Sequence, residues 1–135
     1  MLKYISLTID GCRVRVPQGT SVLDAALDHG ICIPHLCHIK WVSAMGICRL
    51  CLVEVVRNGR SRVTTSCTLE AEEGMEILAH SDLILRLRRN VAELLVAEAP
   101  NSRVIQDIAV RCGVEEVRYP FHNADCSVRP LRAGV

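Results

Sequence analysis

The residues of this sequence best suited to bind a metal are four cysteines with a distinctive spacing, Cys37-x10-Cys48-x2-Cys51-x15-Cys67. A [2Fe–2S] cluster needs four thiolates, two for each iron, because bridging sulfides complete the tetrahedron around each iron. The close Cys48–Cys51 spacing can bring two sulfurs together in a loop, and Gly46 just before it allows the backbone to turn. The pattern therefore indicates one [2Fe–2S] cluster as the cofactor, with these four cysteines as its iron ligands.

Other uses of four cysteines fit this spacing less well. Zinc ribbons usually pair two C-x-x-C knuckles, and this chain has one. A thioredoxin-like redox pair opens a helix beside a βαβ pattern, whereas here the pair leads into a β-rich segment. Plant-type ferredoxins use C-x4-C-x2-C; Cys32-x4-Cys37 mimics its first half, but the next pair comes too late. A zinc-stabilised interaction module stays open as an alternative.

Several further residues near the cysteine pattern have simpler explanations than ligation. The other cysteines, which we expect to be small buried or partly buried side chains, are Cys12, Cys32, Cys112 and Cys126. His35 and His38 flank Cys37, but Rieske-type ligation requires two Cys-x-His pairs of another spacing, so we expect both to be loop or surface residues. Arg49 either offsets the negative charge of a cluster or is solvated.

The composition is that of one modest domain with a short appendage. Half of the 135 residues are apolar, which suffices for a compact core, and the net charge of +1 gives no basic excess for nucleic acid. The first residues lack the regions of a signal peptide, and no apolar run could span a membrane. We therefore expect a cytoplasmic protein with neither nucleic-acid partner nor membrane span, whose eight cysteines serve metal binding rather than disulfides.

Five segments have the alternation or β-rich composition of strands: 3–9, 12–16, 51–56, 62–65 and 75–78. Asp10-Gly11 and Asn58-Gly59 predict tight hairpin turns. Ser21 and Asp24 resemble a capping box, and they predict a helix that Gly30 ends. Residues 32–50 lack periodicity and are predicted to form a loop that holds three of the four ligands. The order fits a small mixed sheet packed on one helix.

Two helices are predicted to follow. The first begins near the N-cap Ser81 and ends at Ala99-Pro100. Its apolar stripe comprises Ile84, Leu87, Val91, Leu94 and Leu95. Its arginines, which we expect on the exposed side or in a docking patch, are Arg86, Arg88 and Arg89. The second helix spans about 103–112, and Gly113 ends it.

These motifs carry a resemblance to a known family. They are 20–26 (TSVLDAA), 30–37 (GICIPHLC), 46–54 (GICRLCLVE), Ser66-Cys67 and 73–75 (EGM). The chain resembles the N-terminal ferredoxin domain of the complex I large iron–sulfur subunit over residues 3–98. The same module occurs in diaphorase subunits of NAD-reducing hydrogenases and in [FeFe]-hydrogenases. The resemblance implies an α+β, β-grasp fold and a low-potential [2Fe–2S] cluster on the four cysteines named above.

The chain also departs from that family. The helix of the relatives commonly leads into a motif of one His and three Cys that binds a [4Fe–4S] cluster, but residues 96–103 contain neither residue type. We therefore expect no second cluster, and either a single-cluster subunit or a short relative that has lost the following domain. The predicted organisation is a β-grasp domain, 1–80, and a helical extension with a C-terminal tail, 81–135, that docks another subunit.

The sequence has no nucleophile–base pair, phosphate-binding glycine loop or nicotinamide fingerprint. We expect a non-catalytic electron-transfer subunit of a larger oxidoreductase, with no active site of its own. By the resemblance, its partners would be a flavin- or NAD(P)H-handling subunit and an iron–sulfur or hydrogenase-like subunit. A free-standing ferredoxin that shuttles electrons between soluble enzymes is the main alternative.

Overall fold

The computed structural model describes residues 1–119, and it divides the chain into two compact units. The first unit is Met1–Ile84, and the second begins at Leu85. The helix α2, Asp82–Glu98, starts in the first unit and continues into the second. The predicted boundary after residue 80 precedes this division and stays a prediction. Among the described residues, no helix is both long and apolar enough to cross a bilayer.

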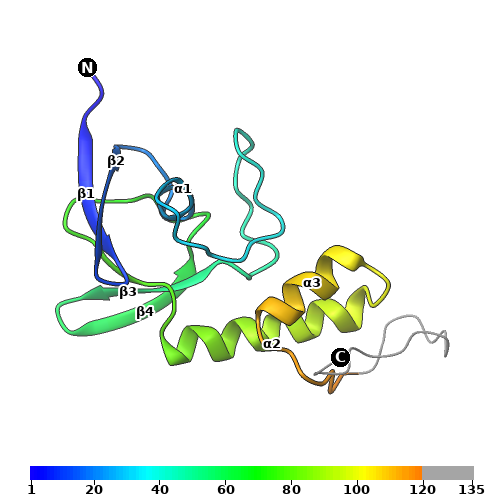
Figure 1. Ribbon diagram of the computed structural model, residues 1–135. Helices are drawn as coiled ribbons and strands as arrows, with labels where there is room; N and C mark the ends of the chain where they lie inside the picture. The colour runs from blue at the N-terminus through cyan, green and yellow to red at the C-terminus, as the bar shows by residue number, and fades with distance from the viewer. Residues whose placement is uncertain (120–135) are drawn as a thin grey trace. The chain divides into compact units, whose positions relative to one another are not determined.

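The first unit is built on a five-stranded mixed sheet with the order β2-β1-β5-β3-β4 (Figure 1). The strands are β1 Tyr4–Ile9, β2 Cys12–Pro17, β3 Leu52–Arg57, β4 Arg60–Thr65 and β5 Glu76–Leu78. β1 and β5 are parallel, and every other neighbouring pair is antiparallel. This is the β-grasp arrangement, and it confirms the predicted fold class.

The two predicted hairpin turns are present, and their backbone angles explain the residues found there. Asp10 and Gly11 have φ of 49° and 80°, and Asn58 and Gly59 have φ of 52° and 72°. Two successive residues with positive φ match the twist of the flanking strands, and Asp-Gly and Asn-Gly adopt them most readily. Each turn therefore fixes the register of its hairpin.

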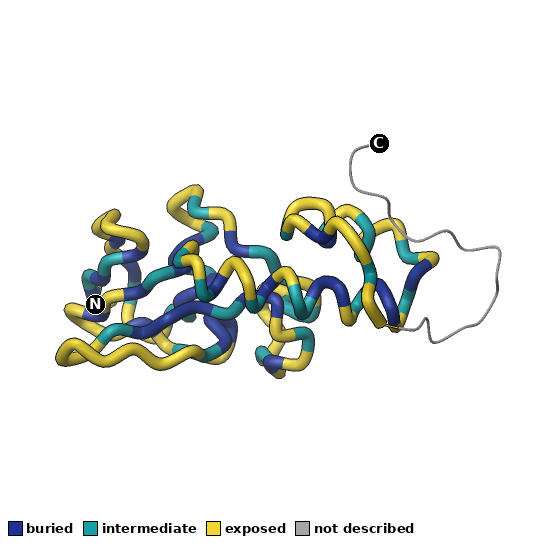
Figure 2. The backbone as a smooth tube through the Cα atoms, turned by 90° about the horizontal axis from the view of Figure 1, so that it is seen from below, coloured by how far each residue is buried: buried dark blue, intermediate teal, exposed yellow. Residues whose placement is uncertain are grey.

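The core of the first unit lies between the sheet and the helix α1, Val22–Asp28. Alternate residues of β1 (Ile5, Leu7 and Ile9) are buried together with the apolar residues of α1. Figure 2 shows the buried parts of the backbone in dark blue and the exposed parts in yellow. Ser21 caps α1: its hydroxyl accepts a hydrogen bond from the Asp24 N–H at 3.1 Å and donates one to the Asp24 carboxylate at 2.9 Å. The capping box and the period-2 burial of β1 are both as predicted.

The second unit contains most of α2 and the helix α3, Arg103–Arg111. Ser102 caps α3 and Gly113, with φ of 77°, follows its end. Two predictions about α2 are wrong. Arg88 is only 2% exposed instead of lying on the solvent side, and Leu94, predicted in the buried stripe, is 49% exposed. The buried face runs through Ile84, Arg88, Ala92 and Val96.

Candidate metal centre

The four predicted ligands come from two parts of the first unit. Cys37 and Cys48 lie in the irregular segment between α1 and β3, whereas Cys51 directly precedes β3 and Cys67 follows β4. Buried Ile33 and Leu50 hold the two ends of the irregular segment. We call residues 32–50 the cluster loop.

The hairpin register brings Cys51 and Cys67 to the same end of the sheet. Leu52 of β3 pairs with Thr65 of β4, so the residues just outside the pair lie side by side. Ser66 reinforces this end, because its N–H and its hydroxyl both donate to the Cys51 carbonyl, at 3.0 and 2.7 Å. The Asn58-Gly59 turn thus sets, through the strand register, which cysteines meet.

The four sulfurs are arranged as two contacting pairs. The Cys37 and Cys48 side chains lie close enough for the Cys48 thiol to lower the pKa of Cys37, and the Cys51 thiol in the same way raises the pKa of Cys67. The two pairs are also near each other, since the charge of Cys37 contributes to the raised pKa of Cys67. Among residues 1–119, no three His, Cys, Asp or Glu side chains are placed to hold a single metal ion.

The electrostatics of the pairs reflect their surroundings. The Cys48 N–H lowers the pKa of Cys37, and it outweighs the opposing effect of burial with help from the Cys48 thiol and the Ile47 N–H. Burial, together with the thiol of Cys51, raises the pKa of Cys67 to about 12, although the Gly46 N–H works against it.

The donor set fits a [2Fe–2S] cluster. Two pairs of soft thiolates match the two-per-iron requirement, and backbone N–H groups of Gly46, Ile47 and Cys48 already point at the sulfurs. N–H groups of this kind stabilise the negative charge of an iron–sulfur centre and tune its potential. We therefore predict that these four cysteines are the ligands.

Sequence reasoning missed one polar residue of the cluster loop. His38 is a loop residue, as predicted, but its side chain is only 9% exposed, and its Nε2 lies 2.9 Å from Asp24 Oδ1. Burial works to raise the pKa of Asp24, but hydrogen bonds with His38 and Ser21 outweigh it, so the pKa is lowered. Asp24 therefore both pairs with the cap residue Ser21 and holds His38, the residue after Cys37. The Asp24–His38 separation of fourteen residues leaves no local sequence signal for this contact.

The predictions for the remaining cysteines are partly wrong. Cys12, the first residue of β2, and Cys32, at the start of the cluster loop, are exposed rather than buried. Cys112 is partly buried, as predicted. Cys126 lies outside the described residues.

The cluster loop also carries an exposed apolar surface between its first two predicted ligands. Its large exposed side chains are Ile39, Trp41, Val42, Met45 and Ile47. Trp41 is 93% exposed and has a positive φ of 74°, which is uncommon for a bulky residue. Strained backbone of this kind collects at functional sites. The loop thus presents apolar contact area beside Cys37 and Cys48.

Comparisons with known proteins agree with this geometry. Residues 3–82 match the family described as the 2Fe-2S iron-sulfur cluster binding domain. The chain is 36% identical to the NADPH-Fe(3+) oxidoreductase subunit alpha of Geobacter sulfurreducens over 85% of its length and 13% of that protein's. It is 30% identical to the NAD-reducing hydrogenase HoxS subunit gamma of Cupriavidus necator, over 85% of this chain and 47% of the relative.

A solved structure is similar as well. A chain of the NAD+-reducing [NiFe]-hydrogenase in the H2-reduced state matches with a TM-score of 0.76 and 33% identity, over 88% of this chain and 53% of that one. This chain therefore spans about half, or much less, of the length of these relatives.

Proposed function

The chain belongs to the family of 2Fe-2S iron–sulfur cluster binding domains, and from that premise we propose that it passes single electrons within a larger oxidoreductase. The family membership and the relatives assign it one [2Fe–2S] cluster. The observation that carries the proposal is the meeting of two cysteine pairs, Cys37 with Cys48 and Cys51 with Cys67. When bound, the cluster supplies reversible one-electron chemistry. The residues of the chain hold it and donate hydrogen bonds to its ligands.

We propose redox subunits as the partners. The relatives named above are subunits of NAD- or NADPH-linked enzymes, one of them a hydrogenase. By analogy, this chain would relay electrons between a flavin- or NAD(P)H-handling subunit and an iron–sulfur or hydrogenase-like one. The exposed apolar part of the cluster loop supports contact with protein partners close to the cluster. We place this work in the cytoplasm, where thiolate ligands stay reduced.

The test of the site is a set of single cysteine replacements. Each of Cys37→Ser, Cys48→Ser, Cys51→Ser and Cys67→Ser should lose or badly destabilise the cluster, because serine is a poor substitute for a soft thiolate. Cys12→Ser and Cys112→Ser are the matched controls and should keep it. Iron and sulfide analysis reads the result. A Cys48→Ser protein with full iron and an unchanged visible spectrum would contradict the assignment.

The iron content per chain tests whether the protein binds a single cluster. The protein should hold about two irons, and dithionite should produce one rhombic electron paramagnetic resonance signal of about one spin per chain. A second signal of cubane type would reveal a site that the ligand assignment omits. A colourless protein with one zinc would instead favour an interaction module.

A further inference from the structure

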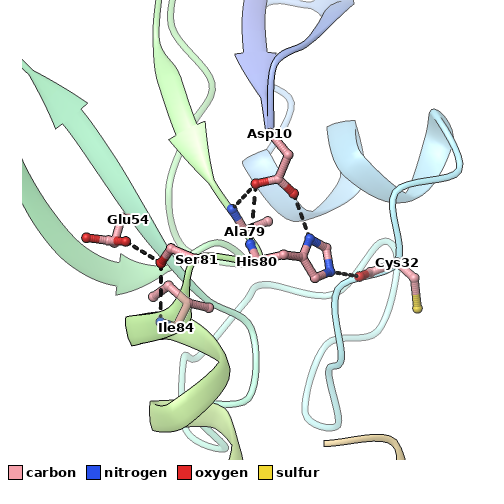
Figure 3. Close-up of polar contacts among 7 residues, drawn as sticks. All are labelled: Asp10, Cys32, Glu54, Ala79, His80, Ser81 and Ile84. Atoms are coloured by element: carbon pink, nitrogen blue, oxygen red, sulfur yellow. Dashed lines mark hydrogen bonds and ion pairs between the residues drawn. The ribbon is translucent and has the colours of Figure 1, made fainter.

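Three segments of the first unit meet at the ring of His80. Asp10 lies at the end of β1, His80 follows β5, and Cys32 begins the cluster loop. Figure 3 shows the imidazole ring between the Asp10 carboxylate and the Cys32 carbonyl. The ring Nδ1 is 2.6 Å from Asp10 Oδ2, and Nε2 is 3.0 Å from the Cys32 oxygen. One side chain thus bridges the sheet and the loop that leads to Cys37.

Asp10 is held independently of the ring. Its Oδ1 accepts hydrogen bonds from the N–H of Ala79 at 2.7 Å and of His80 at 3.3 Å. Partial burial works to raise the pKa of Asp10, but the hydrogen bonds from the His80 ring and the Ala79 N–H outweigh it and lower the pKa. At neutral pH Asp10 is therefore an ionised carboxylate, which accepts hydrogen bonds and donates none.

The two contacts of the ring can form together only if both nitrogens carry a proton. A carboxylate and a carbonyl are both acceptors, whereas a neutral imidazole has one N–H. When the ring loses a proton, the remaining N–H goes to the carboxylate, since hydrogen bonds to charged acceptors are the stronger ones. The Cys32 carbonyl then loses its donor.

The other ionisable groups near His80 do not compete for its two ring nitrogens. The Cys32 sulfur points away from the ring (Figure 3). Glu54 of β3 contacts Ser81, the residue after His80, and not the His80 ring. It accepts a hydrogen bond from the Ser81 hydroxyl, which in turn accepts one from the Ile84 N–H at 3.3 Å. Adjacent residues His80 and Ser81 thus have separate tasks, one at the cluster loop and one at the start of α2.

We propose that His80 is a positioning residue for the cluster, which as an imidazolium ties the start of the cluster loop to the end of β1. The inference rests on the proposed role of Cys37, five residues after Cys32, as a ligand. Buried Ile33 fixes the next side chain, so the Cys32 carbonyl is the point where the incoming backbone is secured. The tie uses both ring N–H groups, because the Asp10 carboxylate and the Cys32 carbonyl both accept, so it secures the cluster loop only while the ring is charged.

The test measures cluster release from the full-length holo protein into excess EDTA, followed by the loss of visible absorbance. The measurements are made near pH 6 and near pH 8.5, on either side of the range in which histidines change charge. His80→Ala should release the cluster about three- to tenfold faster than the wild type near pH 6, the ratio that one hydrogen bond supports. Near pH 8.5 the two rates should converge.

Asp10→Asn makes the test specific. An asparagine can accept from the Ala79 N–H and donate to a neutral His80, which leaves Nε2–H for the Cys32 carbonyl at any pH. This variant should therefore release the cluster more slowly than the wild type near pH 8.5. His29→Ala is the control, because the His29 Nδ1 lies 2.9 Å from the Ala25 carbonyl of α1 rather than bridging two segments, and its rates should match the wild type.

Two results would overturn the role of His80: wild-type release by His80→Ala near pH 6, or a wild-type pH profile for Asp10→Asn. A wild-type protein without any cluster absorbance would instead overturn the proposed function itself. The two failures are therefore distinguishable.

Discussion

At the scale of single residues, Gly46 has the tightest surroundings of the glycines near the cluster. Its φ is +63°, and an added Cβ would lie 3.1 Å from Thr68 Cγ2 and 3.4 Å from Thr65 Oγ1. Its N–H also reaches the sulfur of Cys67. Gly30 has a similar φ of +74° but nothing within 4 Å of a Cβ. Alanine substitutions at the two positions therefore share the backbone strain, and only the one at Gly46 adds crowding.

We predict that Gly46→Ala weakens cluster retention and that Gly30→Ala does not. Both variants should lose about 1 kcal/mol of unfolding free energy from the left-handed backbone, and Gly46→Ala should lose about 1 kcal/mol more from crowding. Urea unfolding of the holo protein and the rate of iron loss to a chelator measure the two effects. Equal iron loss in both variants would show that the space beside Thr68 is unimportant.

The candidate ligands were predictable because their signal is local chemistry: residue type and spacing. The same reasoning could not predict Asp10–His80–Cys32 or Asp24–His38, because these contacts join segments that only the folded sheet brings together. The burial of Arg88 could not be predicted from the sequence either, since an arginine on a helix is ordinarily solvated.

At the scale of elements, caps and hairpin turns were predictable from a few residues each. Ser21 and Asp24 begin α1 as expected, and both Asx-Gly turns set their registers. The buried face of α2 was not predictable in the same way. It combines Ile84 and Val96 with alanines and with the charged Arg88 and Glu93, and hydrophobic periodicity does not identify charged residues as buried.

The α1 cap gives a prediction for the stability of the first unit. Ser21→Ala removes the acceptor for the Asp24 N–H and should lower the unfolding free energy by about 1 kcal/mol. It should also speed cluster loss, because Asp24 holds His38 beside Cys37. Ser102→Ala is the matched control at the cap of α3 in the second unit. Chemical unfolding with absorbance of the cluster as the probe should detect the first variant and not the second.

A second element, the segment after α3, is locked to α2 by a charged contact. Buried Glu93 accepts from Arg118 through its backbone N–H at 2.6 Å and its guanidinium at 2.8–3.2 Å. Hydrogen bonds from Arg118 lower the pKa of Glu93 against the effect of burial. The carboxylate therefore stabilises the fold above its ordinary pKa of 4.5, and this contribution is lost as the pH falls through the lower folded value.

We predict that Glu93→Gln lowers the unfolding free energy by about 2 kcal/mol at neutral pH, since it weakens hydrogen bonds to a charged group. The difference from the wild type should begin to shrink below about pH 4.5, where the carboxylate of the unfolded wild type becomes protonated, and should disappear below the lower folded pKa. Thermal unfolding followed by circular dichroism measures both. Glu115→Gln, at an exposed position, is the control and should change little. A pH-independent difference would contradict the ionic origin.

At the scale of the whole molecule, several large apolar side chains of the second unit are exposed. Its large side chains that are about half exposed or more are Leu85, Leu94, Val104 and Val110. The first unit has its own core, all of whose members lie before residue 80. Ile84 is fully buried, so the first turn of α2 completes that unit.

We predict that a chain ending at Arg86 keeps its cluster but loses its redox partners. The truncation retains the core, His80, Ser81 and Ile84, and it removes Leu94 and α3. Tagged full-length and truncated chains are purified from the native cells, and iron content and co-purifying redox subunits are compared. Leu94→Glu in the full chain should also reduce co-purification, because a buried charge opposes docking on an apolar surface. If the truncated chain cannot hold iron, or still brings down the same subunits, the second unit is not the docking element.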